Sequence, residues 1–169
     1  LPSILGDNMV LQQQAEVKLW GKARPNATVT VKTSWNGQTY KFSSDGKGGW
    51  SLTVSTPVAG GPYKIIFNDG ELLTLQNVLI GEVWFCSGQS NMEMPMGCFD
   101  RQPVRGANDI IAKAKPSTPI RMYTTDSKDG RWVRQFSKTP AEDCQGEWLE
   151  NTPVNVSHIL SLIHISEPT

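Results

Sequence analysis

A short polar turn that follows an apolar run holds the residues with the clearest potential for chemistry. The apolar run is Val83–Cys86, and the turn after it reads Ser87-Gly88-Gln89-Ser90-Asn91. A continuous apolar run of this kind is typical of a strand buried on both faces of a parallel sheet. Where such a strand breaks at a Gly-x-Ser, the hydroxyl lies at the strand's carboxyl end, where α/β sheets open their clefts. The pattern therefore predicts that Ser90 faces a cleft, with Gly88 permitting a tight turn.

Two interpretations of Ser90 are compatible with this pattern. If a helix starts beyond Ser90, its free N–H groups point at the oxygen that becomes negative when an ester carbonyl is attacked. Ser90 would then be a nucleophile in acyl transfer. The alternative is an ordinary strand-to-helix turn in which the serine hydroxyl caps the helix. A Gly-x-Ser alone does not decide between them, because short motifs arise by chance.

The residues before Gly81 are typical of a strand-rich unit. Six runs predict short strands, and in the second, third and fourth of them apolar and polar side chains alternate at period two, which is typical of strands with one buried face. The six runs are Val17–Trp20, Thr28–Trp35, Gln38–Phe42, Trp50–Val54, Tyr63–Phe67 and Leu72–Ile80. Asn36-Gly37 lies between the second and third runs and is typical of a type I′ hairpin turn, whose two central residues need positive φ. Closely spaced strands and turns predict an antiparallel β-sandwich over residues 1–80.

A different pattern begins at Gly81. Beyond the apolar run, Ala107, Ile110, Ile111 and Ala114 share one face of a predicted helix, which Pro116 ends. Ile120–Tyr123 is a predicted second strand. A strand, a helix and a strand in this order indicate the start of an α/β domain, with a domain boundary near residue 80.

Composition excludes several classes of partner. Lys+Arg 16 equals Asp+Glu 16, so bulk electrostatics gives no attraction to nucleic acid or to anionic membranes. No apolar run is long enough to span the roughly 30 Å of a bilayer's hydrocarbon core. No Cys/His spacing resembles zinc ligation. We therefore expect neither a nucleic-acid partner nor a membrane partner, and the sequence leaves the oligomeric state open.

The block Gly81–Met94 closely resembles the nucleophile block of a known enzyme family. It reads Gly-Glu-Val-Trp-Phe-Cys-Ser-Gly-Gln-Ser-Asn-Met-Glu-Met, which is similar to the sialate O-acetylesterase family of the SGNH-hydrolase superfamily. Leu1-Pro2, Asp7–Gln12 and Gly60–Tyr63 resemble the leading β-domain of the same family. The resemblance implies a β-sandwich followed by a flavodoxin-like α/β esterase domain. It also implies removal of acetyl groups from sugar hydroxyls, notably at the 9-position of sialic acids.

The same resemblance implies roles for the residues of the turn. Ser90 would be the nucleophile and its backbone N–H one donor to the oxyanion, while Gly88, Gln89 and Asn91 would support the turn. The implied partner is an O-acetylated sugar, with sialic acid favoured, and no cofactor or metal is implied. The implied location is secreted, lysosomal or periplasmic.

The general base of this family does not have a counterpart in the sequence. In the superfamily it is a His preceded by an Asp at a three-residue offset. His158 and His164 both lie in residues 158–169, and no Asp precedes either at that offset. Without one member of a catalytic triad, rates fall on the order of 10⁴ to 10⁶. We therefore expect little or no esterase activity from this polypeptide alone.

The end of the chain suggests a fragment. Residues 161–169 resemble a translated sequencing-adapter tail, and the resemblance to the family stops near the same place. We therefore expect a β-sandwich domain over residues 1–80, the truncated start of an SGNH-type esterase domain over 81–157, and a non-native tail over 158–169. A gene product with no stable role is a further possibility that these features leave open.

A binding protein is the main alternative to an enzyme. In that interpretation the β-sandwich is a non-catalytic glycan-binding module, with Trp20, Trp35 and Trp50 stacking on sugar rings. Their positions on alternating strands favour the sandwich core instead.

Three further predictions concern cysteines and glycosylation. Cys86, inside the apolar run, is expected in the core, and whether Cys98 and Cys144 pair is open because spacing cannot fix the Cα separation. Asn26 and Asn155 each begin an Asn-x-Ser/Thr triplet, so both are candidate N-glycosylation sites in a secreted eukaryotic protein.

Overall fold

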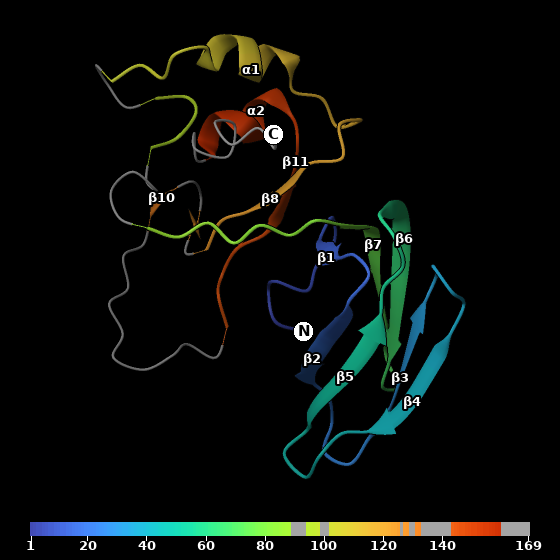
Figure 1. The fold of residues 1–169 in the computed structure, drawn as a ribbon. Coiled ribbons are helices and arrows are strands. Elements are labelled where there is room, and N and C mark those ends of the chain that lie inside the picture. The colour runs from blue at the N-terminus through green and yellow to red at the C-terminus, as the bar shows by residue number, and fades with distance from the viewer. Residues whose placement is uncertain (89–93, 99–101, 126, 129–130, 133–142, 160–169) are drawn as a thin grey trace.

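The structure is a computed structural model, and it describes residues 1–169 except 89–93, 99–101, 126, 129–130, 133–142 and 160–169. Most of the described secondary structure is β (Figure 1). The strands are β1 (Val10–Gln12), β2 (Glu16–Lys22), β3 (Thr28–Thr33), β4 (Thr39–Ser43), β5 (Gly49–Ser55), β6 (Gly60–Asn68), β7 (Leu72–Gly81), β8 (Arg121–Tyr123), β9 (Ser127–Lys128), β10 (Arg131–Trp132) and β11 (Trp148–Glu150). The helices are α1 (Ala107–Lys113) and α2 (Pro153–His158). All six predicted runs contain strands, and their prediction is confirmed.

The larger sheet has the strand order β1-β7-β6-β3-β4, and β2 pairs with β5 in a second sheet. The expectation of a wholly antiparallel arrangement is wrong at one pair, because β1 runs parallel to β7. Parallel neighbours need a long connection between them, and the five intervening strands supply it. The short strand β1 was missed because three residues are too few to show a period.

The β3–β4 hairpin forms as predicted, but its turn differs. The strands end at Thr33 and begin again at Thr39, so the connection is longer than two residues. Gly37 has a positive φ of 67°, whereas Asn36 does not. The Asn36 side chain instead accepts hydrogen bonds from Thr33 Oγ1 and from the Gln38 backbone N–H. The turn is therefore stabilised by the asparagine side chain, and it is not a type I′ turn.

One hydrophobic core joins the two sheets. Leu19 of β2 and Val54 of β5 are fully buried together with Val31 of β3 and Ile65 of β6. The alternating burial along β3 shows the mechanism: successive side chains of a strand point to opposite faces, so one face of the sheet supplies the core. Burial of this apolar surface is the main stabilising contribution to the unit.

A second, smaller hydrophobic cluster lies in the later part of the chain. Its buried members are Met96, Ala107, Met122, Val156 and Ile159. It draws on α1, β8 and α2, so the helix predicted from Ala107 and the strand predicted near Ile120 are both confirmed. β8 pairs antiparallel with β11. The buried residues of the first cluster all precede the end of β7, and those of the second all follow it. The domain boundary near residue 80 stays a prediction.

Two contacts bring the end of the chain to its beginning. The Trp148 indole N–H of β11 donates to the Ile4 carbonyl at 2.7 Å. The Asp143 carboxylate accepts from the hydroxyl and the backbone N–H of Ser3. Within the described ranges, no helix has the length and the apolar character that crossing a bilayer would require.

Candidate active site

The structure describes only the beginning of the predicted serine turn. Ser87 and Gly88 are described, and both are exposed. Gln89, Ser90 and Asn91 lie outside the described residues. Their roles as turn support and nucleophile therefore stay predictions, as does the role of Gly88.

The segment that leads to the turn leaves the end of β7 and crosses the space between the lower strands and the upper helices (Figure 1). The prediction that Val83–Cys86 forms a buried strand is wrong. Trp84 and Phe85 are 81% and 92% exposed, and Cys86 is exposed instead of lying in the core. A strand needs neighbours to accept and donate its ladder hydrogen bonds, and no described strand pairs with this run. Without such neighbours the run stays extended at the surface.

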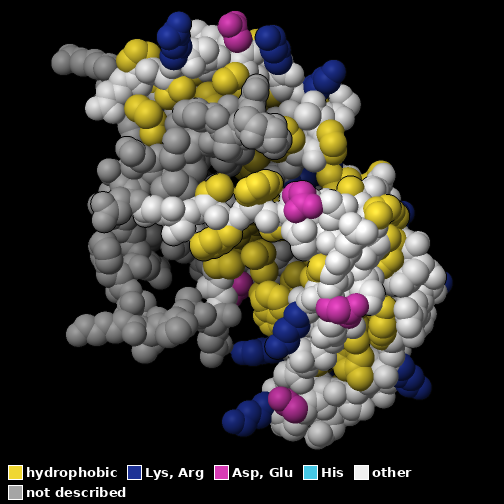
Figure 2. All heavy atoms as spheres, in the orientation of Figure 1, with side chains coloured by type: hydrophobic (Ala, Val, Ile, Leu, Met, Phe, Trp, Pro, Cys, Tyr) yellow, Lys and Arg dark blue, Asp and Glu magenta, His cyan; other side chains and the backbone are white. Residues whose placement is uncertain are grey.

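Hydrophobic side chains also reach the surface around this crossing. Figure 2 shows a band of them between the strand-rich lower part and the upper part of the molecule. A group of exposed apolar side chains larger than a few hundred Å² is unusual in a monomeric protein. The apolar character that suggested a buried strand is therefore present, but it faces solvent in this structure.

Three side chains fix the start of the segment. Glu82 accepts from the Gln12 side-chain amide at 3.0 Å with Oε2 and from the Gln13 side-chain amide at 2.6 Å with Oε1. The Gln12 side-chain oxygen in turn accepts from the Val83 backbone N–H at 2.9 Å. We call Gln12, Gln13 and Glu82 the polar clamp. The hydrogen bonds from Gln12 and then Gln13 lower the pKa of the Glu82 carboxyl, because they stabilise its charged form.

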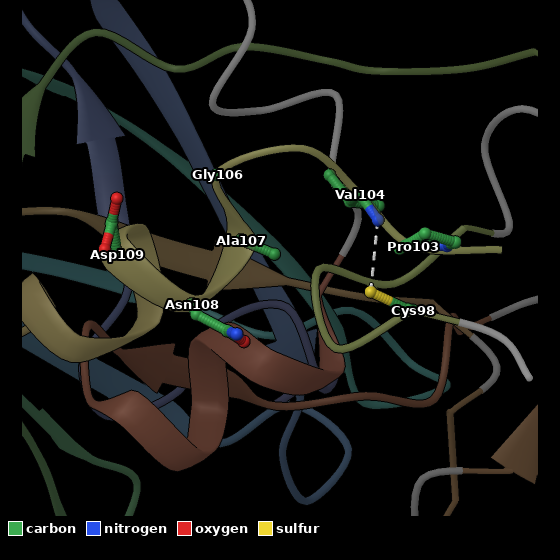
Figure 3. A pocket seen from close by; sticks show the side chains of 7 residues that line it. All are labelled: Cys98, Pro103, Val104, Gly106, Ala107, Asn108 and Asp109. Carbon is green, nitrogen blue, oxygen red and sulfur yellow. Dashed lines mark hydrogen bonds between the residues drawn. The ribbon is translucent and has the colours of Figure 1, made fainter. Parts of the chain in front are cut away.

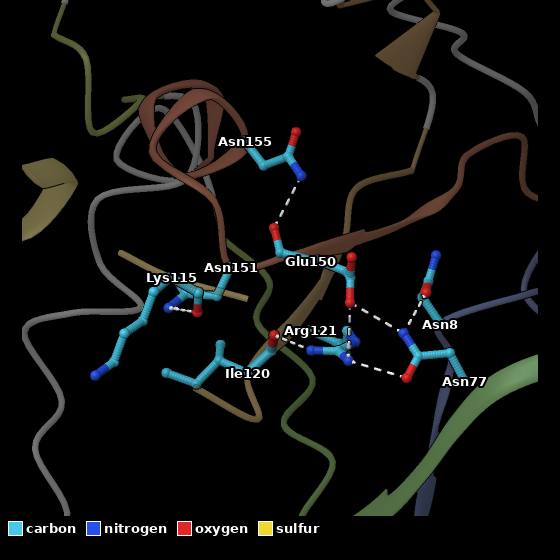
Figure 4. A network of polar contacts seen from close by, with 8 residues as sticks. All are labelled: Asn8, Asn77, Lys115, Ile120, Arg121, Glu150, Asn151 and Asn155. Carbon is cyan, nitrogen blue, oxygen red and sulfur yellow. Dashed lines mark hydrogen bonds and ion pairs between the residues drawn. The ribbon is translucent and has the colours of Figure 1, made fainter. Parts of the chain in front are cut away.

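A partly buried ion pair belongs to a polar network that joins three strands (Figure 4). Arg121 of β8 and Glu150 of β11 are opposite each other in their strand pair, and Nη2 of the arginine is 3.2 Å from Oε1 of the glutamate. Asn77 of β7 donates to the same carboxylate oxygen at 3.0 Å and to Asn8 Oδ1 at 2.7 Å. Asn8 and Asn77 both have positive φ, a conformation that asparagine tolerates better than most residues. This network joins β7 of the first unit to β8 and β11 of the second.

A shallow hollow of about 350 Å³ lies beside the start of α1 (Figure 3). It is lined by Cys98, Pro103, Val104 and residues 106–109. The Cys98 thiol accepts from the Val104 backbone N–H at 3.2 Å, as the dashed line in Figure 3 marks. Most of the rim is exposed, and Asp109 is its only ionisable carboxyl group. The hollow thus has no buried charged group that would orient a ligand.

The structure answers whether Cys98 and Cys144 pair, and it places one of the two histidines. Cys86, Cys98 and Cys144 are all free in the structure. His158 ends α2 and is exposed, and His164 lies outside the described residues. Among the residues that the structure describes, no group of His, Cys, Asp and Glu is arranged to hold a metal ion.

The two candidate glycosylation sites differ in their surroundings. Asn26 is exposed, with a φ of 55° in a loop. Asn155 lies on α2, and its side-chain amide nitrogen donates to the Glu150 carbonyl at 2.8 Å. A glycan on Asn155 would be attached to the atom that makes this bond. Of the two, Asn26 has the geometry better suited to modification.

The tryptophans do not form one sugar-binding face. Trp35 and Trp50 pack against the first core, as favoured from the sequence. Trp20 is 40% exposed, so its expected core position is wrong. Trp20 and Leu19 point to opposite faces of β2, and Leu19 is the residue that enters the core. Because two of the three rings pack against the core, the glycan-binding alternative has little support.

Sequence reasoning missed the polar clamp and the Arg121–Glu150 network. Gln12 and Glu82 are far apart in the sequence, and the hydrogen bonds between them depend on the parallel pairing of β1 with β7. The only sequence signal was the presence of both stretches, Asp7–Gln12 and Gly81–Met94, in the blocks that carried the resemblance.

Comparison with known proteins supports that resemblance. The chain is 34% identical to sialate O-acetylesterase of Homo sapiens over 105 residues, which are 54% of this chain and 20% of that protein. The corresponding protein of Mus musculus is 34% identical over 102 residues, again 54% of this chain and 19% of that one. The chain thus spans about a fifth of the length of these curated relatives. No family model matches it.

A solved structure is similar over nearly the whole chain. A carbohydrate acetylesterase from Xanthomonas citri superposes with a TM-score of 0.82 at 28% sequence identity, covering 97% of this chain and 35% of that one. The fold is thus that of part of a carbohydrate acetylesterase structure. Together with the two sialate O-acetylesterases, it confirms the resemblance of this chain to the sialate O-acetylesterase family, over the part of those proteins that the chain covers.

Proposed function

We propose that the chain is part of a carbohydrate O-acetylesterase in which Ser90 is the nucleophile. The observation that carries this proposal is the similarity to a carbohydrate acetylesterase structure over 97% of the chain. The curated relatives are named sialate O-acetylesterase, so an acetylated sialic acid is the proposed substrate. A secreted, lysosomal or periplasmic location is part of the same proposal.

The proposed reaction has two steps. The Ser90 hydroxyl gives up its proton as its oxygen attacks the acetyl carbonyl carbon, the bond from that carbon to the sugar oxygen breaks, and the sugar oxygen takes up a proton in exchange. Water then attacks the acetyl-serine, releasing acetate and restoring the hydroxyl. The backbone N–H of Ser90 is proposed as one donor to the oxyanion of each tetrahedral intermediate.

We propose the two-sheet unit as a β-sandwich and residues 81–157 as the beginning of the SGNH-type domain. The shared core of Leu19, Val54, Val31 and Ile65 supports the first assignment. The order of α1 and β8 after Gly81 supports the second.

The test of this function supplies a general base from solution. An aryl acetate is incubated with the purified chain and with Ser90→Ala, each with and without imidazole. We expect slow turnover by the unmodified chain without imidazole, because neither histidine has an Asp at the expected offset. With imidazole as external base, we expect hydrolysis that depends on Ser90 and exceeds the Ser90→Ala background. Equal rates from the two proteins under all conditions would contradict the nucleophile assignment.

A further inference from the structure

We propose that Glu82 is a positioning residue, and that the polar clamp of Gln12, Gln13 and Glu82 fixes the start of the serine-bearing segment to β1. The inference rests on the proposed function only for the role of Ser90. The clamp itself consists entirely of described residues.

The clamp holds three successive residues at the exit of β7. The Gly81 carbonyl accepts from the Gln13 backbone N–H at 2.8 Å. The Glu82 carboxylate accepts from both glutamine side chains, and the Val83 N–H donates to Gln12 Oε1. Gln12 and Gln13 therefore hold both the backbone and the side chain of this segment.

Convergence of two neighbouring glutamines on one carboxylate requires a break in the strand. Successive side chains of a regular strand point to opposite faces. Gln12 is the last residue of β1, and Gln14 has a positive φ of 48°. The chain thus leaves the regular strand at Gln13, which allows both side chains to reach Glu82. The Gln13 side-chain oxygen is fixed in turn by the Ala59 N–H at 2.8 Å.

The other hydrogen bonds of Gln12 and Gln13 determine which kind of side chain suits position 82. Both glutamine side-chain oxygens already accept from backbone N–H groups, of Val83 and Ala59. Each glutamine therefore presents only its NH₂ group to residue 82. An ionised carboxylate is an acceptor at both oxygens and suits two donors, whereas an amide at position 82 would place a third NH₂ against one of them.

The segment directly after the clamp, residues 84–88, is without hydrogen bonds to other described residues. All five residues are exposed. The clamp is therefore the last fixed point before the chain leaves the described residues toward Ser90. Its direction of exit sets where the following residues begin.

The test uses the whole 169-residue chain and a reciprocal exchange. In Glu82→Gln and Glu82→Ala we expect the Val83 amide to exchange with deuterium about tenfold faster, since its acceptor is no longer oriented. In the double variant Gln12→Glu with Glu82→Gln, the donor and acceptor are interchanged. The carboxylate introduced at position 12 would accept from both the Val83 N–H and the amide introduced at position 82, so exchange should return to within about twofold of the original rate. Glu71→Gln, at an exposed glutamate whose side chain has no described partner, is the matched control.

A readout of the reaction separates positioning from stability. With imidazole present, Ser90-dependent ester hydrolysis should fall in Glu82→Gln and recover in the reciprocal double variant. Absence of Ser90-dependent hydrolysis from every protein would count against the proposed function but leave the Val83 measurement intact. Unchanged Val83 exchange in both single variants, or no recovery in the double variant, would overturn the clamp.

A measurement on the unmodified chain guards against variants that fail to fold. By NMR relaxation, the side-chain NH₂ groups of Gln12 and Gln13 should be ordered, and that of the exposed Gln14 should not. Equal mobility of the three groups would also overturn the proposal.

Discussion

Arg121 and Glu150 face each other across the β8–β11 pair, with 3.2 Å between Nη2 and Oε1. The arginine side chain is only 4% exposed, while that of the glutamate is 35% exposed. The guanidinium is therefore almost removed from water, and the Glu150 carboxylate compensates its charge. Asn77 of β7 donates to Glu150 and accepts from Arg121. The ion pair therefore also connects β8 and β11 to the first unit.

Removal of the glutamate should destabilise the protein. We expect Glu150→Ala to lower the free energy of unfolding by about 2 kcal/mol, below the roughly 3–5 kcal/mol typical of fully buried pairs because Glu150 is partly in water. The measurement is the midpoint of urea unfolding. Glu147→Ala, at an exposed neighbour, should leave the midpoint within error. Equal effects of the two variants would show that the pair is not buried as described.

The first core should respond to truncation at Leu19. Leu19 has no exposed surface, so Leu19→Ala should cost about 2–5 kcal/mol through lost burial and the cavity that remains. Leu72→Ala removes the same atoms from a side chain that is 72% exposed, and should cost less than about 0.5 kcal/mol. Thermal or urea unfolding of the two variants compares them directly. Similar losses would contradict the assigned core.

The lowered pKa of the Glu82 carboxyl predicts how its contribution to stability changes with pH. Because the folded-state pKa lies below the unfolded value, the stabilisation from Glu82 is fully present above the unfolded pKa. It is lost as pH falls through the lowered folded pKa. An NMR titration of the Glu82 carboxyl carbon should therefore give a midpoint below that of an ordinary glutamate side chain. A midpoint at or above the ordinary value would be inconsistent with the two amide donors.

The exposed apolar run should matter more for association than for folding. Replacing Trp84 and Phe85 by serine removes side chains that are almost fully in water, so the free energy of unfolding should change by less than about 0.5 kcal/mol. Binding of a hydrophobic dye such as ANS should fall at the same time. A large loss of stability without a change in dye binding would show that these side chains are buried in solution.

The sequence predicted those parts of the fold that depend on local periodicity. Val29 and Val31 of β3 alternate with polar neighbours and lie in the core, and α1 presents Ala107 inward, as its spacing indicated. The run Val83–Cys86 shows the limit of this reasoning, because an apolar run specifies what a strand would bury but not whether neighbouring strands are present to bury it.

The features that sequence reasoning missed are contacts between distant residues. Gln12 meets Glu82 only because β1 pairs in parallel with β7, and that pairing leaves no local signal. Arg121 and Glu150 likewise meet through strand pairing. Ser90 was singled out by the Gly-x-Ser turn after an apolar run, the resemblance of the whole block to a family then favoured a nucleophile over a helix cap, and Ser90 lies outside the described residues.

The proposed role of Ser90 is to carry the acetyl group during the reaction. Its most direct test is mass spectrometry of the peptide that contains Ser90, after the chain is quenched during incubation with an aryl acetate and imidazole. The proposal predicts an acetyl group on Ser90 of the unmodified chain and none on the corresponding peptide of Ser90→Ala. Ester hydrolysis of equal rate in both proteins, with no acetyl group on the Ser90 peptide, would contradict it.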